Sequence, residues 1–207
     1  MKDSLVALWF LAATFQSGLS FAADGISPPS WPVEDFDSAH LLRKPLRTLM
    51  MGQMSVVLGK TPLKDIRENL GIGKQFEGGD ASESITWLCY TIPGNPAARL
   101  WLTSSEMYGG SIVDGFSAIE LPETAQAVPA CPELPKRFRS IALAGGIELG
   151  LSEKQLEARL PPYKQGISPK LFHYKLRKAE SGIDIFLLVK MDRGHLAGIS
   201  ATYSESD

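Results

Sequence analysis

The side chains that most often do chemistry are sparse in this chain. It contains three histidines, His40, His173 and His195. A catalytic triad needs a nucleophile and an orienting carboxylate around a histidine, and no spacing around these positions indicates one. His173 and His195 could approach each other across a sheet, or they could simply face solvent. We expect no catalytic residue and no metal site, because no His or second Cys stands at ligand spacing.

Acidic and glycine-rich patterns give no stronger catalytic signal. Glu120, Glu123 and the stretch 77–80 supply carboxylates, but paired-acid catalysis depends on a separation that sequence does not give. Residues 71–74 read Gly-Ile-Gly-Lys. They follow a predicted helix and lack the spacing of a phosphate-binding loop, so we interpret them as a helix end and a turn. No enzyme activity and no cofactor are predicted.

The N-terminal residues have the pattern of a cleavable signal peptide. Lys2 precedes an apolar stretch over residues 5–15 that is too short to span a bilayer. Small residues before Ala23 predict cleavage there; the alternative is a buried N-terminal helix. No cysteine stands just after the apolar stretch, so a lipoprotein signal is not expected. The mature protein is predicted to be periplasmic or secreted, with no stable membrane insertion after cleavage.

The two cysteines are interpreted in light of export. Cys89 lies in a predicted strand and Cys131 lies in a proline-rich stretch. An even count in an oxidising compartment favours one disulfide, which would fasten that stretch to the strand. The alternative is two free thiols, with Cys89 as an ordinary core residue.

Composition indicates a globular protein without a nucleic-acid footprint. Hydrophobic residues make up 44% of the chain, charged residues 21%, and the net charge is −2. A nucleic-acid-binding domain is expected to carry a basic patch or stripe, and here lysine and arginine are scattered. We therefore expect no nucleic-acid partner.

The elements that must position these residues come from a repeated pattern. Residues 59–71 read Gly-x-Thr-x-x-x-x-Ile-x-x-x-Leu-Gly, and residues 150–161 read Gly-x-Ser-x-x-x-Leu-x-x-x-Leu-Pro, which differs by one residue fewer before the first apolar position. Each copy predicts a short helix, with Thr61 and Ser152 as N-caps. Each helix is followed by three predicted strands, over 85–92, 99–104 and 111–121 in the first copy and over 171–176, 183–191 and 195–203 in the second. Residues 115–118 and 198–201 also match.

The repeat predicts an α+β fold of two tandem repeats, each a short helical segment packed on a small antiparallel β-sheet. The expected organisation is a signal peptide (1–22), a proline-rich leader or arm (23–45), repeat module 1 (46–121), a proline-rich join (122–137) and repeat module 2 (138–207). Trp31 is expected to anchor the arm to a module.

The motifs resemble a known superfamily of exported proteins. The residues that carry the resemblance are Gly59, Thr61, Ile66, Leu70 and Gly71 in the first copy, with Gly150, Ser152, Leu156 and Leu160 in the second. The pattern looks like the SmpA/OmlA family of outer-membrane assembly lipoproteins. It is also similar to the tandem-repeat β-lactamase inhibitor proteins, whose two copies and lack of a lipid anchor match better. The resemblance implies a protein-binding module.

Strand alternation then selects a candidate binding surface. If the helices cover one face of each sheet, the opposite face is expected to carry the residues that contact a protein partner. Aligning the copies places Trp87, Cys89, Leu100 and Leu102 inward. The predicted outward contact residues are Tyr90, Arg99, Trp101, Lys175, Phe186 and Lys190. The alternative is that the arm, the other module or the join covers these aromatic residues.

Three functions are compatible with these sequence features. The first is an exported, non-catalytic protein-binding module, such as an inhibitor or immunity-type protein that occludes an enzyme. The second is an assembly or structural factor of the bacterial cell envelope. The third is a small hydrolase, which a polar pocket with a perturbed carboxylate or histidine would favour.

Overall fold

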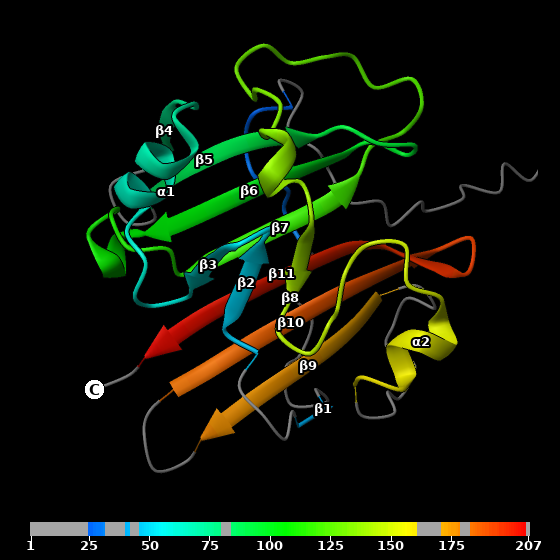
Figure 1. Cartoon of the computed structure of the whole chain (residues 1–207). Coiled ribbons are helices and arrows are strands. Elements are labelled where there is room, and N and C mark those ends of the chain that lie inside the picture. The colour runs from blue at the N-terminus through cyan, green and yellow to red at the C-terminus, as the bar shows by residue number, and fades with distance from the viewer. Residues whose placement is uncertain are drawn as a thin grey trace, which may run out of the picture.

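The computed structural model (Figure 1) describes residues 25–31, 40–41, 46–79, 84–160, 171–178 and 183–205, with the backbone alone for 40–41 and 171–178. These residues form two mainly antiparallel sheets and two short α-helices. The predicted α+β class is therefore confirmed, with sheet as the main component. Within the described residues, no helix is long and apolar enough to cross a membrane.

The larger sheet has eight strands in the order β1-β9-β10-β11-β7-β6-β5-β4. They are β1 (His40–Leu41), β4 (Gln75–Gly78), β5 (Ile85–Ile92), β6 (Ala98–Ser105), β7 (Gly115–Glu120), β9 (Leu171–Lys178), β10 (Ile183–Asp192) and β11 (His195–Glu205). Neighbours are antiparallel except for the parallel β1–β9 pair. Between β10 and β11, Arg193 and Gly194 both have positive φ, as a two-residue type I′ hairpin turn requires.

The smaller sheet has three antiparallel strands in the order β3-β2-β8, formed by β3 (Met54–Val57), β2 (Thr48–Met51) and β8 (Ile141–Leu143). The 3-10 helices η2 (Glu106–Tyr108) and η3 (Lys136–Phe138) lie in the connections.

Both predicted α-helices are present. In α1 (Leu63–Leu70), the predicted N-cap is wrong by one residue, because Pro62 occupies that position and the Thr61 hydroxyl accepts the Val57 N–H instead. Gly71 ends α1 in the left-handed conformation. In α2 (Glu153–Glu157), Ser152 and Gln155 form the predicted capping box.

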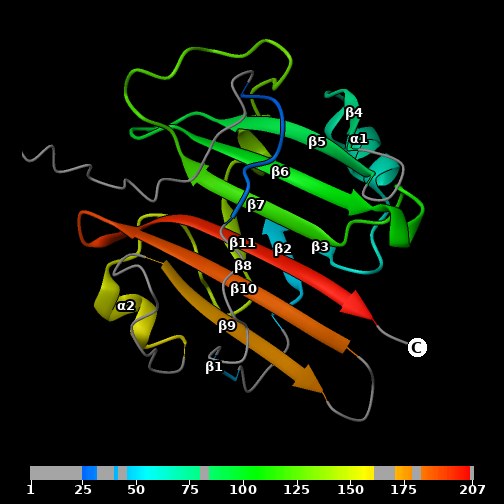
Figure 2. The same ribbon diagram turned by 180° about the vertical axis from the view of Figure 1, so that it is seen from behind.

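The larger sheet has two different faces. Figure 1 shows the smaller sheet and both helices on one side of it, which we call the inner face. The main hydrophobic core fills this side, and the predicted helix anchors Leu63, Ile66, Leu70, Leu156 and Leu160 are all buried there. Figure 2 shows the opposite side, the outer face, with residues 25–31 (blue) running over it.

The two predicted modules share both sheets. In the larger sheet, β4 to β7 come from module 1 and β9 to β11 come from module 2; in the smaller sheet, β8 of module 2 pairs with β2 of module 1. The strands of the two modules meet where β7 pairs with β11, with Ser117 opposite Ser200. The expected pair of separate small sheets is therefore replaced by one continuous sheet and one smaller sheet.

Candidate functional site

Strand register arranges the outer face in rows that run across the strands. The middle row consists of Cys89, Trp101, Ser117, Ser200 and Leu188. On one side of it lies the row of Thr91, Arg99, Ile119, Gly198 and Lys190; on the other lies the row of Trp87, Thr103, Gly115, Thr202 and Phe186. We call the stretch of Thr103, Gly115, Thr202 and Phe186 the open row, because Thr202 is exposed and Thr103 and Phe186 are half-buried.

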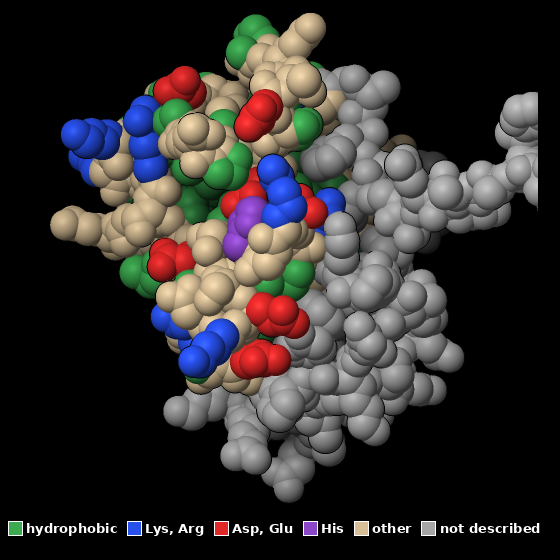
Figure 3. Space-filling view, turned by 90° about the vertical axis from the view of Figure 1, so that its right-hand side faces the viewer, with side chains coloured by type: hydrophobic (Ala, Val, Ile, Leu, Met, Phe, Trp, Pro, Cys, Tyr) green, Lys and Arg blue, Asp and Glu red, His purple; other side chains and the backbone are tan. Residues whose placement is uncertain are grey.

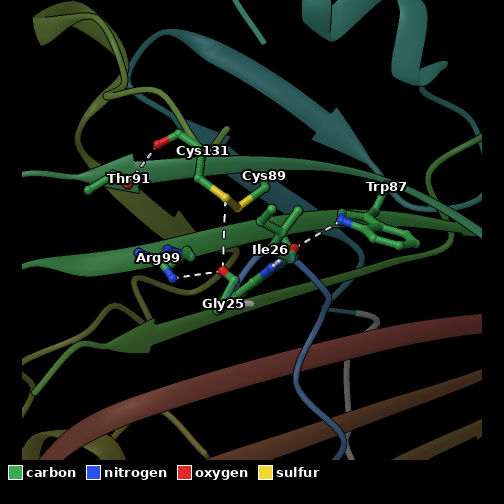
Figure 4. The surroundings of a disulfide bond; sticks show 8 residues. Gly25, Ile26, Trp87, Cys89, Thr91, Arg99 and Cys131 are labelled. Atoms are coloured by element: carbon green, nitrogen blue, oxygen red, sulfur yellow. Dashed lines mark hydrogen bonds between the residues drawn. A yellow bond between two sulfur atoms is a disulfide. The ribbon is translucent and has the colours of Figure 1, made fainter. Parts of the chain in front are cut away.

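Residues 25–31, which we call the docked segment, lie on this outer face (Figure 2). The carbonyl of Ile26 accepts hydrogen bonds from the indole N–H groups of Trp87, at 3.0 Å, and Trp101, at 2.8 Å. The carbonyl of Gly25 accepts one from Arg99 Nη1 at 2.7 Å (Figure 4). The sheet therefore holds the start of this segment through its backbone carbonyls.

Trp31 holds the other end of the docked segment, as the sequence predicted. The residue is 9% exposed and belongs to a cluster with Trp87, Trp101 and Leu188. A Cβ on Gly198 would lie 3.1 Å from the Trp31 ring, so a glycine in β11 makes room for the indole.

A chain of buried hydrogen bonds begins at Trp31. Its indole N–H donates to Ser117 Oγ at 3.0 Å, and Ser117 Oγ donates to Ser200 Oγ at 3.0 Å. Ser200 Oγ in turn donates to the carbonyl of Phe116 at 3.0 Å. Because every donor in this series of hydrogen bonds has an acceptor, the two serines can be buried without leaving an unpaired polar group. We call the sheet residues that contact the docked segment, Trp87, Arg99, Trp101, Ser117 and Gly198, the arm site.

Arg99 is the charged member of the arm site. The residue is 4% exposed, and its Nε is buried without a hydrogen-bond partner. Burial lowers the pKa of its guanidinium, because the charged form loses hydration. The group that accepts the hydrogen bond from its Nη1, the carbonyl of Gly25, is neutral. Arg99 therefore remains a cation whose charge the docked segment does not balance.

The predicted disulfide between Cys89 and Cys131 is confirmed (Figure 4). It joins β5 to the proline-rich stretch, and backbone hydrogen bonds from Thr91 to Pro132 and from Leu134 to Thr91 continue the connection. Cys131 Sγ lies 4.0 Å from the carbonyl of Gly25; a disulfide sulfur has no proton to donate, so this is a packing contact. The disulfide thus forms one wall of the arm site.

The structure corrects the expected exposure of three predicted contact residues. Trp101 and Arg99 do lie on the outer face, but they are buried beneath the docked segment. Tyr90 is buried on the inner face, where its hydroxyl donates to the carbonyl of Ile72. For Trp101, the structure therefore agrees with the alternative prediction, in which the N-terminal arm covers the aromatic residues.

The other three predicted contact residues lie on β9 and β10. Phe186 and Lys190 are half-buried on the outer face. Lys175 is opposite Phe186 in the β9–β10 register, and its side chain lies outside the described part of the structure. The register therefore extends the open row toward Lys175 and places Lys190 in the row of Arg99.

The error at Tyr90 comes from β5, which is buried on both faces. Residues 86–90 are all buried, so exposed and buried residues do not alternate along this part of the strand. Register pairs Cys89 with Trp101 and Tyr90 with Leu100. Trp87 and Cys89 therefore share the outer face with Trp101, and the predicted inward orientation of these two residues is wrong.

A cavity of about 530 Å³ lies at one end of the sheet. It opens between the β5–β6 turn, the end of β7 and the β10–β11 turn, and Figure 3 shows a histidine among acidic and basic side chains on this side. His195 Nε2 lies 2.7 Å from Glu120 Oε2, and Arg193 pairs with Asp192 at 3.3 Å. No group of three or more potential metal ligands is found among the described residues.

Sequence patterns indicate some of these residues and miss others. The repeated pattern at 115–118 and 198–201 places Ser117 and Ser200 at equivalent positions, but it does not indicate that they pair. The sequence does not indicate that Gly198 makes room for Trp31, because a glycine in a strand can have several structural roles. The contact between His195 and Glu120 joins residues 75 positions apart, and nothing in their local sequence indicates it.

Comparisons with known proteins found no match to this chain among protein-family models, curated proteins or solved structures.

Proposed function

We propose that this protein is an exported, non-catalytic binding module that holds a protein partner against the outer face of its eight-stranded sheet. The observation that carries the proposal is the docked segment. The arm site binds two backbone carbonyls and one tryptophan side chain of the docked segment. A segment of another protein could present the same groups. Aromatic and arginine side chains of this kind dominate protein interfaces when they are desolvated.

The open row offers the surface that the partner reaches beside the docked segment. It presents hydroxyl groups of Thr103 and Thr202 beside the ring of Phe186. Such a mixture of polar and aromatic groups is typical of protein-binding surfaces. The row runs over strands of both predicted modules, so a partner seated there would contact both.

Two further inferences belong with this proposal. Ser117 and Ser200 occupy equivalent positions at the β7–β11 junction, which supports a duplicated helix-and-sheet unit. The motifs that resemble the tandem-repeat inhibitor proteins favour a binding role. The disulfide supports export to the periplasm or beyond, because disulfides persist in oxidising compartments. The predicted signal peptide, residues 1–22, lies outside the described residues.

The test compares two arginine substitutions on opposite faces. The partner is captured from envelope and secreted fractions of the source with residues 23–207, purified, and its affinity measured for each variant. Thr202→Arg places a long charged side chain in the open row, and Asn69→Arg adds the same side chain to the exposed side of α1. We expect Thr202→Arg to weaken binding by about tenfold or more, equivalent to about 1.4 kcal/mol, and Asn69→Arg to leave it unchanged. Equal affinities for both variants would move the interface away from the outer face.

The identity of the captured partner separates an inhibitor from an assembly factor. An enzyme whose activity falls when the module binds would assign it to the inhibitor or immunity type. Components of the outer-membrane assembly machinery would assign it to envelope assembly or to a structural role.

The cavity favours a second candidate function, a small hydrolase. In this role the carboxylate of Glu120 would orient the imidazole of His195 toward a bound substrate, as carboxylates orient catalytic histidines. The test is a screen of ester, amide and phosphate substrates with the wild type and His195→Ala. Turnover that His195→Ala abolishes would establish the hydrolase, and a partner affinity unchanged by the same substitution would show that binding is separate.

A further inference from the structure

The docked segment leaves the charge of Arg99 unmatched. Its Nη1 donates to a neutral carbonyl, and its Nε is buried without a partner. In the part of the chain that the structure describes, no carboxylate lies within ion-pairing distance of Arg99. A buried cation is costly unless a carboxylate pairs with it, and the fork of an arginine matches a carboxylate with two parallel hydrogen bonds. The arm site therefore has an unused capacity for a negative group.

The backbone at position 25 points toward this cation. A Cβ built on Gly25 would lie 2.8 Å from Arg99 Nη1, the flexible end of that side chain. Gly25 has a φ of +61°, in the left-handed region that aspartate and asparagine tolerate better than other residues with side chains. An aspartate at this place in a bound peptide could therefore meet the guanidinium after a small shift of the arginine.

The rest of the segment combines a backbone contact with buried apolar side chains. Trp87 and Trp101 bind the carbonyl of Ile26, which every residue possesses. Pro28 and Pro29 favour an extended backbone, and Pro29 is buried. The space above Gly198, filled by Trp31, selects a large aromatic ring, and the side chain of Ile26 packs against the same hydrophobic cluster.

We propose that the arm site also binds an extended segment of the partner protein, one that presents an aspartate to Arg99, a main-chain carbonyl to Trp87 and Trp101, and an aromatic ring to the space of Trp31. This inference rests on the proposed function and names the partner's chemistry. The partner segment replaces residues 25–31, and its ion pair with Arg99 gives it an advantage over the chain's own glycine.

Two synthetic peptides test the proposal without the partner. One is the N-acetylated, C-amidated sequence Gly-Ile-Ser-Pro-Pro-Ser-Trp, and the other carries Asp in place of the first Gly. Each is titrated by calorimetry into residues 23–207 as the wild type, as Trp31→Ala, and as Trp31→Ala combined with Arg99→Gln. Trp31→Ala weakens the chain's own segment and so frees the site.

The expected result is a charge preference that depends on Arg99. The acidic peptide binds Trp31→Ala about tenfold more tightly than the neutral peptide, and Arg99→Gln removes the difference. The wild type binds both peptides about tenfold more weakly than Trp31→Ala, because its own segment occupies the site.

Several outcomes would overturn the proposal. These are a folded Trp31→Ala variant that binds neither peptide, equal affinities for the two peptides, or a preference that survives Arg99→Gln. If Trp31→Ala does not fold, Trp31→Phe decides the question in the same way, because it keeps a ring but loses the hydrogen bond to Ser117.

Two controls separate this inference from its alternatives. If the wild type is a dimer and Trp31→Ala is a monomer, the arm site binds residues 25–31 of a second copy. That result would overturn the proposal that it binds a segment of a partner protein. If the peptides fail while Thr202→Arg still weakens binding of the captured partner, the proposed function stands and this inference falls.

Discussion

Tyr203 illustrates how single residues set the chemistry of the inner face. Its ring packs against Gly59, and the guanidinium of Arg47 lies 5.0 Å from the ring centre. Its hydroxyl donates to Glu205 Oε2 at 2.8 Å. Burial and this bond to a carboxylate raise the pKa of Tyr203 to about 12, because both disfavour the phenolate.

The raised pKa predicts a loss of stability at alkaline pH. Between pH 10 and pH 12 the unfolded chain releases the phenol proton while the folded protein retains it, so the free energy of unfolding falls as pH rises. Tyr203→Phe removes this contribution, and the urea midpoint should fall less between pH 9 and pH 11 than in the wild type. Burial also raises the pKa of Tyr90 and Tyr108, so some dependence remains. Identical midpoint changes in both proteins would contradict the prediction.

At the scale of elements, the disulfide is the clearest test of how the proline-rich stretch is held. Cys89 and Cys131 are 42 residues apart, and closing a loop of that length stabilises the fold by about 4 kcal/mol in the chain-entropy model. Replacing both cysteines with alanine should lower the free energy of unfolding by about that amount, measured by urea denaturation. A change close to zero would show that the hydrogen bonds between Thr91 and the stretch suffice alone.

The positions of β5, β10 and β11 follow closely from the sequence because turn residues bound them. By contrast, β4 and the three strands of the smaller sheet are not predicted, and the strand predicted over 111–121 begins four residues before β7. The predicted strand over 85–92 agrees with β5 at both ends, and those over 183–191 and 195–203 agree with β10 and β11 within two residues. Proline and glycine pairs end these strands for local reasons. Local signals also locate both helices, and their apolar spacing correctly identifies the buried residues.

The faces of the strands are harder to predict than their positions. In β10, Ile185, Leu187 and Val189 face the main core as expected, and only Leu188 on the opposite face is also buried. β5 does not alternate, because the docked segment covers its second face and both sides are buried. That covering is a contact between residues about 60 to 75 positions apart, which no local pattern encodes. Strand alternation therefore assigns Trp101 and Arg99 to a free binding surface, although residues 25–31 cover them.

At the scale of the whole molecule, the shared sheets should make the protein a single cooperative unit. β8 completes the smaller sheet begun by β2 and β3, and β11 pairs with β7 in the larger one. One hydrophobic core contains Leu70 of α1 and Leu160, just after α2. Neither half of the chain has a closed core of its own, so neither is expected to unfold alone.

Substitutions in the two halves test this cooperativity. Leu70→Ala and Leu160→Ala each remove a buried side chain, 5% and 4% exposed, and each should destabilise the fold by about 2–4 kcal/mol. Both should shift the same urea transition, followed by circular dichroism and by the near-ultraviolet signal of the aromatic residues. A second transition that moves with only one of the substitutions would show that the halves unfold separately.

The clustering of indole rings on the outer face has an optical consequence. The chain contains four tryptophans; Trp9 belongs to the predicted signal peptide, and Trp31, Trp87 and Trp101 all lie in one cluster with the Cys89–Cys131 bridge. The intrinsic tryptophan fluorescence of residues 23–207 therefore originates entirely at the docked segment and the part of the outer face beneath it. Water reaching these rings would shift the emission to longer wavelength, and greater distance from the quenching disulfide would brighten it. Tryptophan fluorescence can therefore report, without an added label, what occupies the arm site.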